Sequence, residues 1–204
     1  IFALNLVQSV FHMAKILLIH GYGTGNPVYN KKERYYQFLG FKKLIDAEEA
    51  VVFEWFKKED YHNFEFLNPI HHFLVYKKER VLADEKKTFE SLGLFLKTNK
   101  PKIIICHSMG SFLLLNYLKH SDLPDFVEKV IFIQADVPRS FQIPDDIKKR
   151  LEDHQLTWEN YYCHWDFALI ASLFINMYIP AGLAGTSSKL IKNRFYPLHS
   201  YILL

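Results

Sequence analysis

The chain has 204 residues, of which 50% are hydrophobic and 16% are aromatic, enough apolar side chain for one compact domain with a sizeable core. Lysine and arginine total 25 against 22 acidic residues, and the net charge of +3 is spread along the chain, which argues against a nucleic-acid partner. No apolar run in the sequence reaches the roughly 18 residues that a membrane-spanning helix needs, so we expect no membrane span.

The sequence does not begin with methionine, and Met13 stands directly before the first strand-like apolar run. Residues 1–12 lack the basic region and the small-residue cleavage site of a signal peptide. We therefore expect residues 1–12 to be an upstream or added N-terminal extension. Residues 13–204 are expected to form a single domain.

Short apolar runs predict buried strands at residues 15–19, 50–56, 102–106, 129–134 and 159–163. Segments with helical periodicity lie at residues 31–49, 83–98, 109–120 and 166–178. Continuous apolar strands separated by helices are typical of a parallel sheet covered on both faces. The predicted fold class is therefore α/β, with a mostly parallel central sheet.

Two longer segments interrupt this alternation, namely residues 57–82 and 136–158. We expect both to be loop excursions above the carboxyl edge of the sheet, where long ordered loops form walls or lids of a site.

Only two cysteines occur, Cys106 and Cys163, each at the end of a predicted strand where a small apolar side chain packs well. We expect no disulfide between them. Such low cysteine usage is compatible with a reducing, cytoplasmic location.

The glycines of "IHGYGTGN" follow the first predicted strand at positions 21, 23 and 25. A dinucleotide-binding loop is excluded by the spacing of the third glycine, and a phosphate-binding P-loop is excluded because no Gly-Lys-Ser/Thr follows. The turn is instead suited to aim backbone N–H groups, including that of Tyr22, at a developing oxyanion.

Ser108 lies in "KIIICHSMGSFLLLNYL", where an apolar strand passes through a tight turn into an apolar helix. A nucleophile elbow has this form and needs small residues two positions before and after the serine, here Cys106 and Gly110. The Met109 amide would lie at the positive end of the helix and serve as a second oxyanion donor. The alternative is that Ser108 is simply the N-cap of a core helix.

With "HGYG" and "CHSMG" in this arrangement, residues 15–204 resemble the α/β-hydrolase superfamily, in particular compact bacterial serine hydrolases of the esterase and lipase type. The resemblance implies a minimal cap or none, no metal or cofactor, and the chain order nucleophile, acid, histidine.

For the histidine in that order, His199 in "YPLHSYILL" is favoured by its position near the end of the chain. His20 and His107 are expected to orient backbone or fill space beside the turns. His62, His71 and His72 lie in the first excursion, where they either line a pocket or lie on the surface. His154 and His164 precede the acid region.

For the acid, Asp166 in "HWDFAL" is favoured because most members of the superfamily carry the acid after the later strand. Asp136 in "FIQADVPRS" is the alternative, since a minority place it after the preceding strand. Asp166 could also serve only as a helix N-cap.

These residues predict a serine hydrolase with a Ser108, Asp166 and His199 triad that cleaves small or varied carboxylic esters. Two alternatives stay open: a binding protein that holds a ligand without turnover, and a thioesterase or acyltransferase that uses the same triad. The sequence gives no oligomeric state.

Overall fold

The structure, a computed structural model, describes residues 15–22, 41–56 and 69–197. Several sequence predictions fall outside these residues: the N-terminal extension, Gly23, Gly25, His62 and His199.

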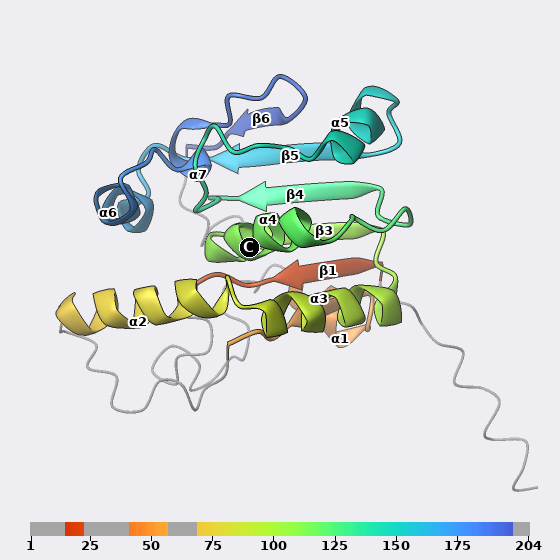
Figure 1. Cartoon of the computed structure of the whole chain (residues 1–204), viewed down its shortest axis with the longest axis horizontal. Coiled ribbons are helices and arrows are strands. Elements are labelled where there is room, and N and C mark those ends of the chain that lie inside the picture. Colours follow the sequence, from red (N-terminus) through yellow and green to blue (C-terminus); the bar gives the residue numbers. More distant parts are fainter. Residues whose placement is uncertain (1–14, 23–40, 57–68, 198–204) are drawn as a thin grey trace, which may run out of the picture.

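Six parallel strands form one sheet in the order β2-β1-β3-β4-β5-β6. Their bounds are β1 Ile16–Ile19, β2 Ala50–Phe53, β3 Ile103–His107, β4 Lys129–Ile133, β5 Thr157–Tyr162 and β6 Lys192–Phe195. The predicted α/β class with a parallel sheet is confirmed, and the arrowheads of β1, β4, β5 and β6 point to the same side of the molecule (Figure 1).

The direction in which the chain winds through the sheet reverses between β1 and β3. From β1 the chain moves outward to β2, then returns to the other side of β1 and continues outward from β3 to β6. In open α/β sheets, ligands bind outside the carboxyl ends of the strands at such a reversal point. This places the turns that follow β1 and β3 at the position where a site is expected.

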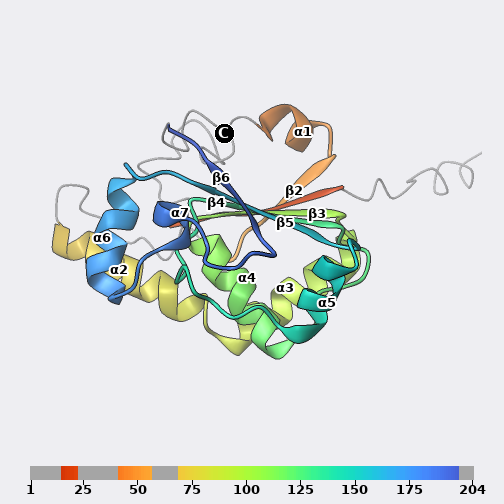
Figure 2. The same cartoon turned by 90° about the horizontal axis from the view of Figure 1, so that it is seen from above.

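Helices cover both faces of the sheet (Figure 2). α3 (Lys86–Asn99), α4 (Met109–His120) and α5 (Asp145–Glu152) lie on one face, and the short α1 (Lys42–Asp46) lies on the other. Alternate side chains of β1 enter two separate apolar clusters: Leu17 and Ile19 join the large core under α3 and α4, whereas Leu18 packs in the smaller cluster near α1. β2, β3 and β4 also contribute to both clusters, so these four strands are buried on both sides, as their apolar runs indicate. The edge strand β6 is exposed.

Two further helices, α2 (Pro69–Leu82) and α6 (Phe167–Asn176), lie beyond the carboxyl ends of the strands (Figure 1). The short α7 (Ala181–Ala184) follows α6. α2 occupies the second half of the segment 57–82, which the sequence assigned to a loop. Pro69 is its first residue, the helical position that proline favours, and Val75, Tyr76 and Glu79 are buried at helical spacing.

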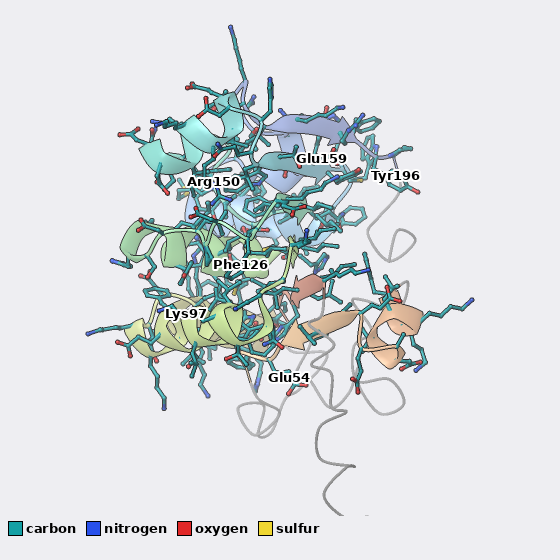
Figure 3. All side chains as sticks on the ribbon, turned by 90° about the vertical axis from the view of Figure 1, so that its right-hand side faces the viewer. Glu54, Lys97, Phe126, Arg150, Glu159 and Tyr196 are labelled. Atoms are coloured by element: carbon teal, nitrogen blue, oxygen red, sulfur yellow. The ribbon has the colours of Figure 1, made fainter. Side chains whose placement is uncertain are left out.

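At the opposite, amino edge of the sheet, the charged side chain of Arg150 connects α5 to the chain before β4 (Figure 3). Arg150 of α5 donates hydrogen bonds to the carbonyl oxygens of Leu123 (2.8 Å) and Val127 (2.6 Å), which ties α5 to the loop before β4.

Within the ranges that the structure describes, no helix is both long and apolar enough to cross a bilayer.

Gly110, in the first turn of α4, allows this helix to begin against the end of β1. A Cβ atom at this position would lie 2.4 Å from the Ile19 carbonyl oxygen and 2.8 Å from that of His20. Both distances are far inside van der Waals contact, and both partners are backbone atoms that cannot rotate away. Only glycine fits here without displacing α4 from β1.

We expect Gly110→Ala to lower the free energy of unfolding by about 2–3 kcal/mol, because the new methyl group overpacks the backbone of β1. Gly93→Ala in α3 is the matched control, since the nearest atom to its Cβ would be Tyr117 Cε2 at 3.4 Å, an ordinary side-chain contact. Alanine favours the helix, so the control should gain about 0.5 kcal/mol. Urea unfolding of both variants measures the difference; equal stabilities would contradict the close approach.

Candidate functional site

Ser108 has a backbone conformation that serine rarely adopts. It lies between β3 and α4 with φ 47° and ψ −117°, in the positive-φ region that costs a non-glycine residue about 1–3 kcal/mol. Backbone hydrogen bonds hold it there: its N–H donates to Ile133 O (3.0 Å), and its carbonyl accepts from the N–H groups of Ser111 (3.0 Å) and Asp136 (3.1 Å). The side chain is half-buried, whereas its neighbours His107 and Met109 are buried.

The alternative interpretation of Ser108, a helix-capping serine, requires its hydroxyl to accept a hydrogen bond from the first turn of α4. Ser108 does occupy the N-cap position of α4, but its side chain makes no capping hydrogen bond there. Capping therefore does not explain why a strained serine stands at this turn.

The turn after β1 lies directly against Ser108. A Cβ atom on Gly21 would be 2.8 Å from Ser108 Cβ and 2.9 Å from the His107 carbonyl oxygen, so the backbone can approach this closely only at a glycine. The structure thus brings residues 20–22, the described part of "HGYG", together with "CHSMG", the other turn that the sequence singled out.

His20 fixes the shape of the first turn. Its ring is buried and stacks on Trp55 with the centroids 5.3 Å apart, and its Nδ1–H donates to the Gly21 carbonyl oxygen at 3.0 Å. The Trp55 indole N–H donates in turn to the His20 carbonyl oxygen at 3.1 Å. Burial lowers the pKa of His20 to about 4, so the imidazole is neutral at neutral pH. The expected backbone-orienting role of His20 agrees with these contacts.

Both residues expected to donate backbone N–H groups lie at this meeting of turns. Met109 is the first residue of α4, so its amide has no acceptor within the helix and points from the positive end of the helix dipole. Tyr22 follows Gly21 in the other turn. Its hydroxyl donates to the His72 carbonyl oxygen (3.3 Å) and lies 3.0 Å from His72 Nδ1, so its side chain connects the turn to α2.

Asp136, the alternative acid, lies just after β4 and its carboxylate is buried in a polar network. Three hydroxyl groups donate to it: those of Tyr76 on α2 (2.7 Å), Ser172 on α6, and Tyr178 just after α6 (3.2 Å). The Asp136 network, as we call this cluster, joins β4 to both helices beyond the carboxyl edge.

Arg80 of α2 supplies the positive charge of the Asp136 network. Its guanidinium lies 3.6 Å from the Asp136 carboxylate, donates to the hydroxyls of Tyr76 (3.1 Å) and Tyr178 (2.8 Å), and stacks 3.8 Å above the Phe112 ring. Burial, followed by the charge of Asp136, raises the pKa of Tyr76 to about 12 and raises that of Tyr178 as well. Both hydroxyls therefore stay protonated and donate.

Asp166, the favoured acid, is buried at the start of α6, four residues after the end of β5. Its Oδ1 accepts a hydrogen bond from the Leu169 N–H at 3.1 Å, so the N-cap role considered from the sequence is confirmed. Whether Asp166 also orients a histidine is not decided by this bond. His199, its expected partner, lies outside the described residues.

The other histidines and the two cysteines that the sequence singled out have the following contacts in the described part of the chain. His164 Nδ1–H donates to the Leu183 carbonyl oxygen at 2.8 Å, and His71 and His72 lie on α2. Cys106 is fully buried, and burial raises the pKa of its thiol well above the usual value, which argues against a nucleophilic role for this thiol. Both cysteines lie in the described part of the chain, and neither is in a disulfide.

Sequence reasoning missed the partners of Asp136. The signal that could have found them is helical spacing: Tyr76 and Arg80 are four residues apart on α2, as are Ser172 and Asn176 on α6, so each pair shares one face of its helix. Asn176 completes the network by donating to Ser172 Oγ at 2.8 Å.

Comparison with protein-family models found no family that matches this chain, and comparison with curated proteins found no significant match. In the ranges 15–22, 41–56 and 69–197, no three His, Cys, Asp or Glu side chains are arranged to hold a metal ion. Function therefore has to be inferred from the geometry around Ser108.

We expect the stability of the protein to fall as the pH drops through the range between the unfolded and folded pKa values of His20. Because the folded pKa is about 4 and the unfolded value is 6.5, protonation favours the unfolded chain. By this linkage His20 alone lowers the free energy of unfolding by about 2 kcal/mol between roughly pH 7.5 and pH 5.

Urea unfolding of wild type and His20→Phe at both pH values tests this expectation. The phenylalanine keeps the ring against Trp55 but does not titrate, so the stability difference between the two proteins should shrink at the lower pH. A constant difference would show that His20 is already accessible to protons in the folded state.

Proposed function

We propose that the protein is a serine hydrolase that cleaves carboxylic esters through an acyl-enzyme intermediate. The observation that carries the proposal is the conformation of Ser108: a half-exposed serine at φ 47°, between a buried parallel strand and a helix, without a capping hydrogen bond. A nucleophile elbow uses this strained strand-to-helix turn to present its serine above the sheet. The α/β fold with its parallel sheet is compatible with the resemblance to the α/β-hydrolase superfamily.

In the proposed reaction, Ser108 Oγ attacks the carbonyl carbon of the ester while His199 takes the hydroxyl proton. The backbone N–H groups of Met109 and Tyr22 stabilise the oxyanion of the tetrahedral intermediate. His199 then returns the proton to the leaving alcohol, and water releases the acid from the acyl-enzyme by the same steps in reverse order.

The chain path supports this assignment of roles. Ser108 follows β3, Asp166 follows β5, and β6 ends at Phe195, four residues before His199 in the sequence. Because β3, β5 and β6 are parallel, all three strands end at the same edge of the sheet. The nucleophile, acid and histidine therefore follow strands in the order that the superfamily uses.

Asp166 is preferred to Asp136 as the acid because of what surrounds the Asp136 carboxylate. Three hydroxyl donors and Arg80 already contact it. A triad acid needs to accept the Nδ1–H of the histidine, and this acceptor capacity is taken up at Asp136. We assign Asp136 a structural role.

The substrate class in this proposal is a small-molecule ester with an apolar acyl group, since aromatic side chains of α2 and the turn after β1 border the site: Tyr22 packs edge-on against Tyr76 with ring centroids 5.9 Å apart. No cofactor is needed for this chemistry. The cytoplasmic location expected from cysteine usage stays a prediction.

Treatment with a fluorophosphonate is the direct test of the nucleophile. We expect one adduct per chain, located on Ser108 by intact mass and peptide mapping, because the proposed machinery activates this hydroxyl. Ser108→Ala should give no adduct, and His199→Ala should slow labelling strongly. Ser111, a buried serine one helical turn away, provides the control, since Ser111→Ala should still be labelled. A folded wild type that takes up no probe would refute a hydrolytic Ser108.

Two asparagine variants separate the roles of the acids. Asp166→Asn should lower p-nitrophenyl butyrate turnover by about 10³–10⁴-fold, because the histidine loses its orienting carboxylate. It should cost less than about 1 kcal/mol of stability, since asparagine is an equally good N-cap. Asp136→Asn should instead lower the free energy of unfolding by about 2–4 kcal/mol. The new amide N–H₂ group would point at hydroxyl groups that donate hydrogen bonds to the carboxylate in the wild type, so those hydroxyls would lose an acceptor.

Turnover and urea unfolding are measured on both variants. If Asp136→Asn keeps the wild-type stability but loses turnover, while Asp166→Asn stays active, the two assignments are reversed.

A further inference from the structure

α6 is a helix without a single charged residue that nevertheless lies at the surface. Its sequence, FALIASLFIN, is apolar on nearly every side. A helix of this kind is normally buried in a core or in a membrane. Here one stripe of it faces outward, and four large apolar side chains on and beside it are between 70% and 87% exposed: Trp165, Phe167, Phe174 and Met177.

α2 presents a second apolar stripe at the same end of the molecule. Ile70 and Leu74, one helical turn apart, are 69% and 60% exposed, and Phe73 between them is also exposed. Monomeric soluble proteins rarely leave contiguous large apolar side chains of this number in water. Two neighbouring helices with outward apolar stripes therefore need an explanation other than chance.

The Asp136 network makes the two helices one unit. Tyr76 of α2 contacts the hydroxyl of Ser172 on α6 (3.3 Å), and Arg80 of α2 donates to the Tyr178 hydroxyl just after α6 (2.8 Å). Both helices also stand beyond the carboxyl ends of the strands, on the side where the turn of Ser108 lies (Figures 1 and 2). α2 and α6 therefore stand at the same edge of the sheet as the candidate site.

The exposed and partly exposed charges on α2 and α6 have one sign. On α2, Lys78 is exposed and Lys77 is partly exposed, with its ammonium group 5.7 Å from the centre of the Phe73 ring. Glu79, the one acidic residue of α2, is fully buried, and Asp166 at the start of α6 is buried as well. Every exposed or partly exposed charged side chain on α2 and α6 is thus positive.

We propose that α2 and α6 together form a docking surface for an anionic lipid bilayer, which would hold the side of the molecule that carries Ser108 against the membrane. Exposed Trp, Phe, Leu and Ile side chains enter the boundary between headgroups and acyl chains, and lysines beside them are attracted to anionic headgroups. α6 has ten residues, about 15 Å of helix, a length that lies along a bilayer surface and does not cross it.

A second copy of the chain fits this surface less well. A two-fold contact repeats the same patch on both sides, so Lys77 and Lys78 of one copy would meet the like-charged patch of the other. A bilayer that contains anionic lipid offers the complementary charge and an apolar interior at once.

The three tryptophans provide a probe that needs no variant. Trp55 and Trp158 are buried and Trp165 is 70% exposed. A shift of the fluorescence emission when water around a tryptophan is replaced by lipid therefore reports on Trp165, beside α6. We expect the emission of the full chain to shift to the blue with vesicles of phosphatidylcholine and phosphatidylserine, and brominated acyl chains to quench it. Pure phosphatidylcholine vesicles should give a weaker response, and added salt should reduce the binding to mixed vesicles.

Matched variants locate the surface. Phe174→Glu on α6 should weaken vesicle binding by about tenfold or more, because it removes an aromatic ring that the bilayer would bury and adds a charge that anionic headgroups repel. Leu94→Glu is the control: Leu94 is 68% exposed, as Phe174 is 71% exposed, but it lies on α3, away from α2 and α6. Lys77→Glu should weaken binding only to vesicles that contain phosphatidylserine.

Three results would overturn the proposal. The first is wild-type emission that neither shifts nor is quenched with any vesicle. The second is equal loss of binding in Leu94→Glu and Phe174→Glu. The third is a dimer in sedimentation velocity that Phe174→Glu dissociates, which would assign the surface to a second copy. Ser108→Ala should bind vesicles as the wild type does, so a failure of the hydrolase proposal would leave this one standing.

Discussion

The close contact between the start of α4 and the end of β1 is the constraint on which the rest of the site depends. Gly110 brings α4 against the carbonyl oxygens of Ile19 and His20, and Gly21 brings the next turn against Ser108. Because Gly110 meets backbone atoms and Gly21 meets Ser108 Cβ and the His107 carbonyl oxygen, none of which can rotate away, these contacts fix the position of Ser108 rigidly. The strain of Ser108 persists because hydrogen bonds from two neighbouring segments hold it in place.

The Asp136 network gives the site its outer wall. A buried carboxylate near one arginine would be weakly stabilising by itself, since desolvation offsets most of the attraction. Here the surrounding hydroxyls of Tyr76, Ser172 and Tyr178 satisfy its remaining acceptor sites, and the network becomes a specific fastening between α2, α6 and β4. The same two helices carry the outward apolar stripes. Their inner sides thus fasten them to β4 through the Asp136 network, while their outer sides form the proposed docking surface.

Much of the fold could be predicted from the sequence because β1 to β4 are buried on both faces. Continuous runs such as that of β3 are typical of parallel strands, and α4 begins and ends where its apolar pattern does. The turn of Ser108 was predictable because small residues flank it. α2 was missed because its many polar residues, histidines and lysines among them, obscure the helical spacing of its buried side chains. The Asp136 network was missed because its members are far apart along the chain. The geometry of the proposed triad cannot be described, since His199 lies outside the described residues.

The long sequence separations within the Asp136 network also have a consequence for folding. Asp136 bonds to Tyr76, 60 residues earlier, and to Ser172, 36 residues later. These bonds can form only after β4, α2 and α6 have all been brought together, so the outer wall is assembled after the sheet that supports it. By the same reasoning, α2 and α6 form a cooperative unit that can open while the strands stay paired. Asp136 thus joins the two parts of the site: its carboxylate holds α2 and α6, and its backbone N–H donates to the Ser108 carbonyl oxygen.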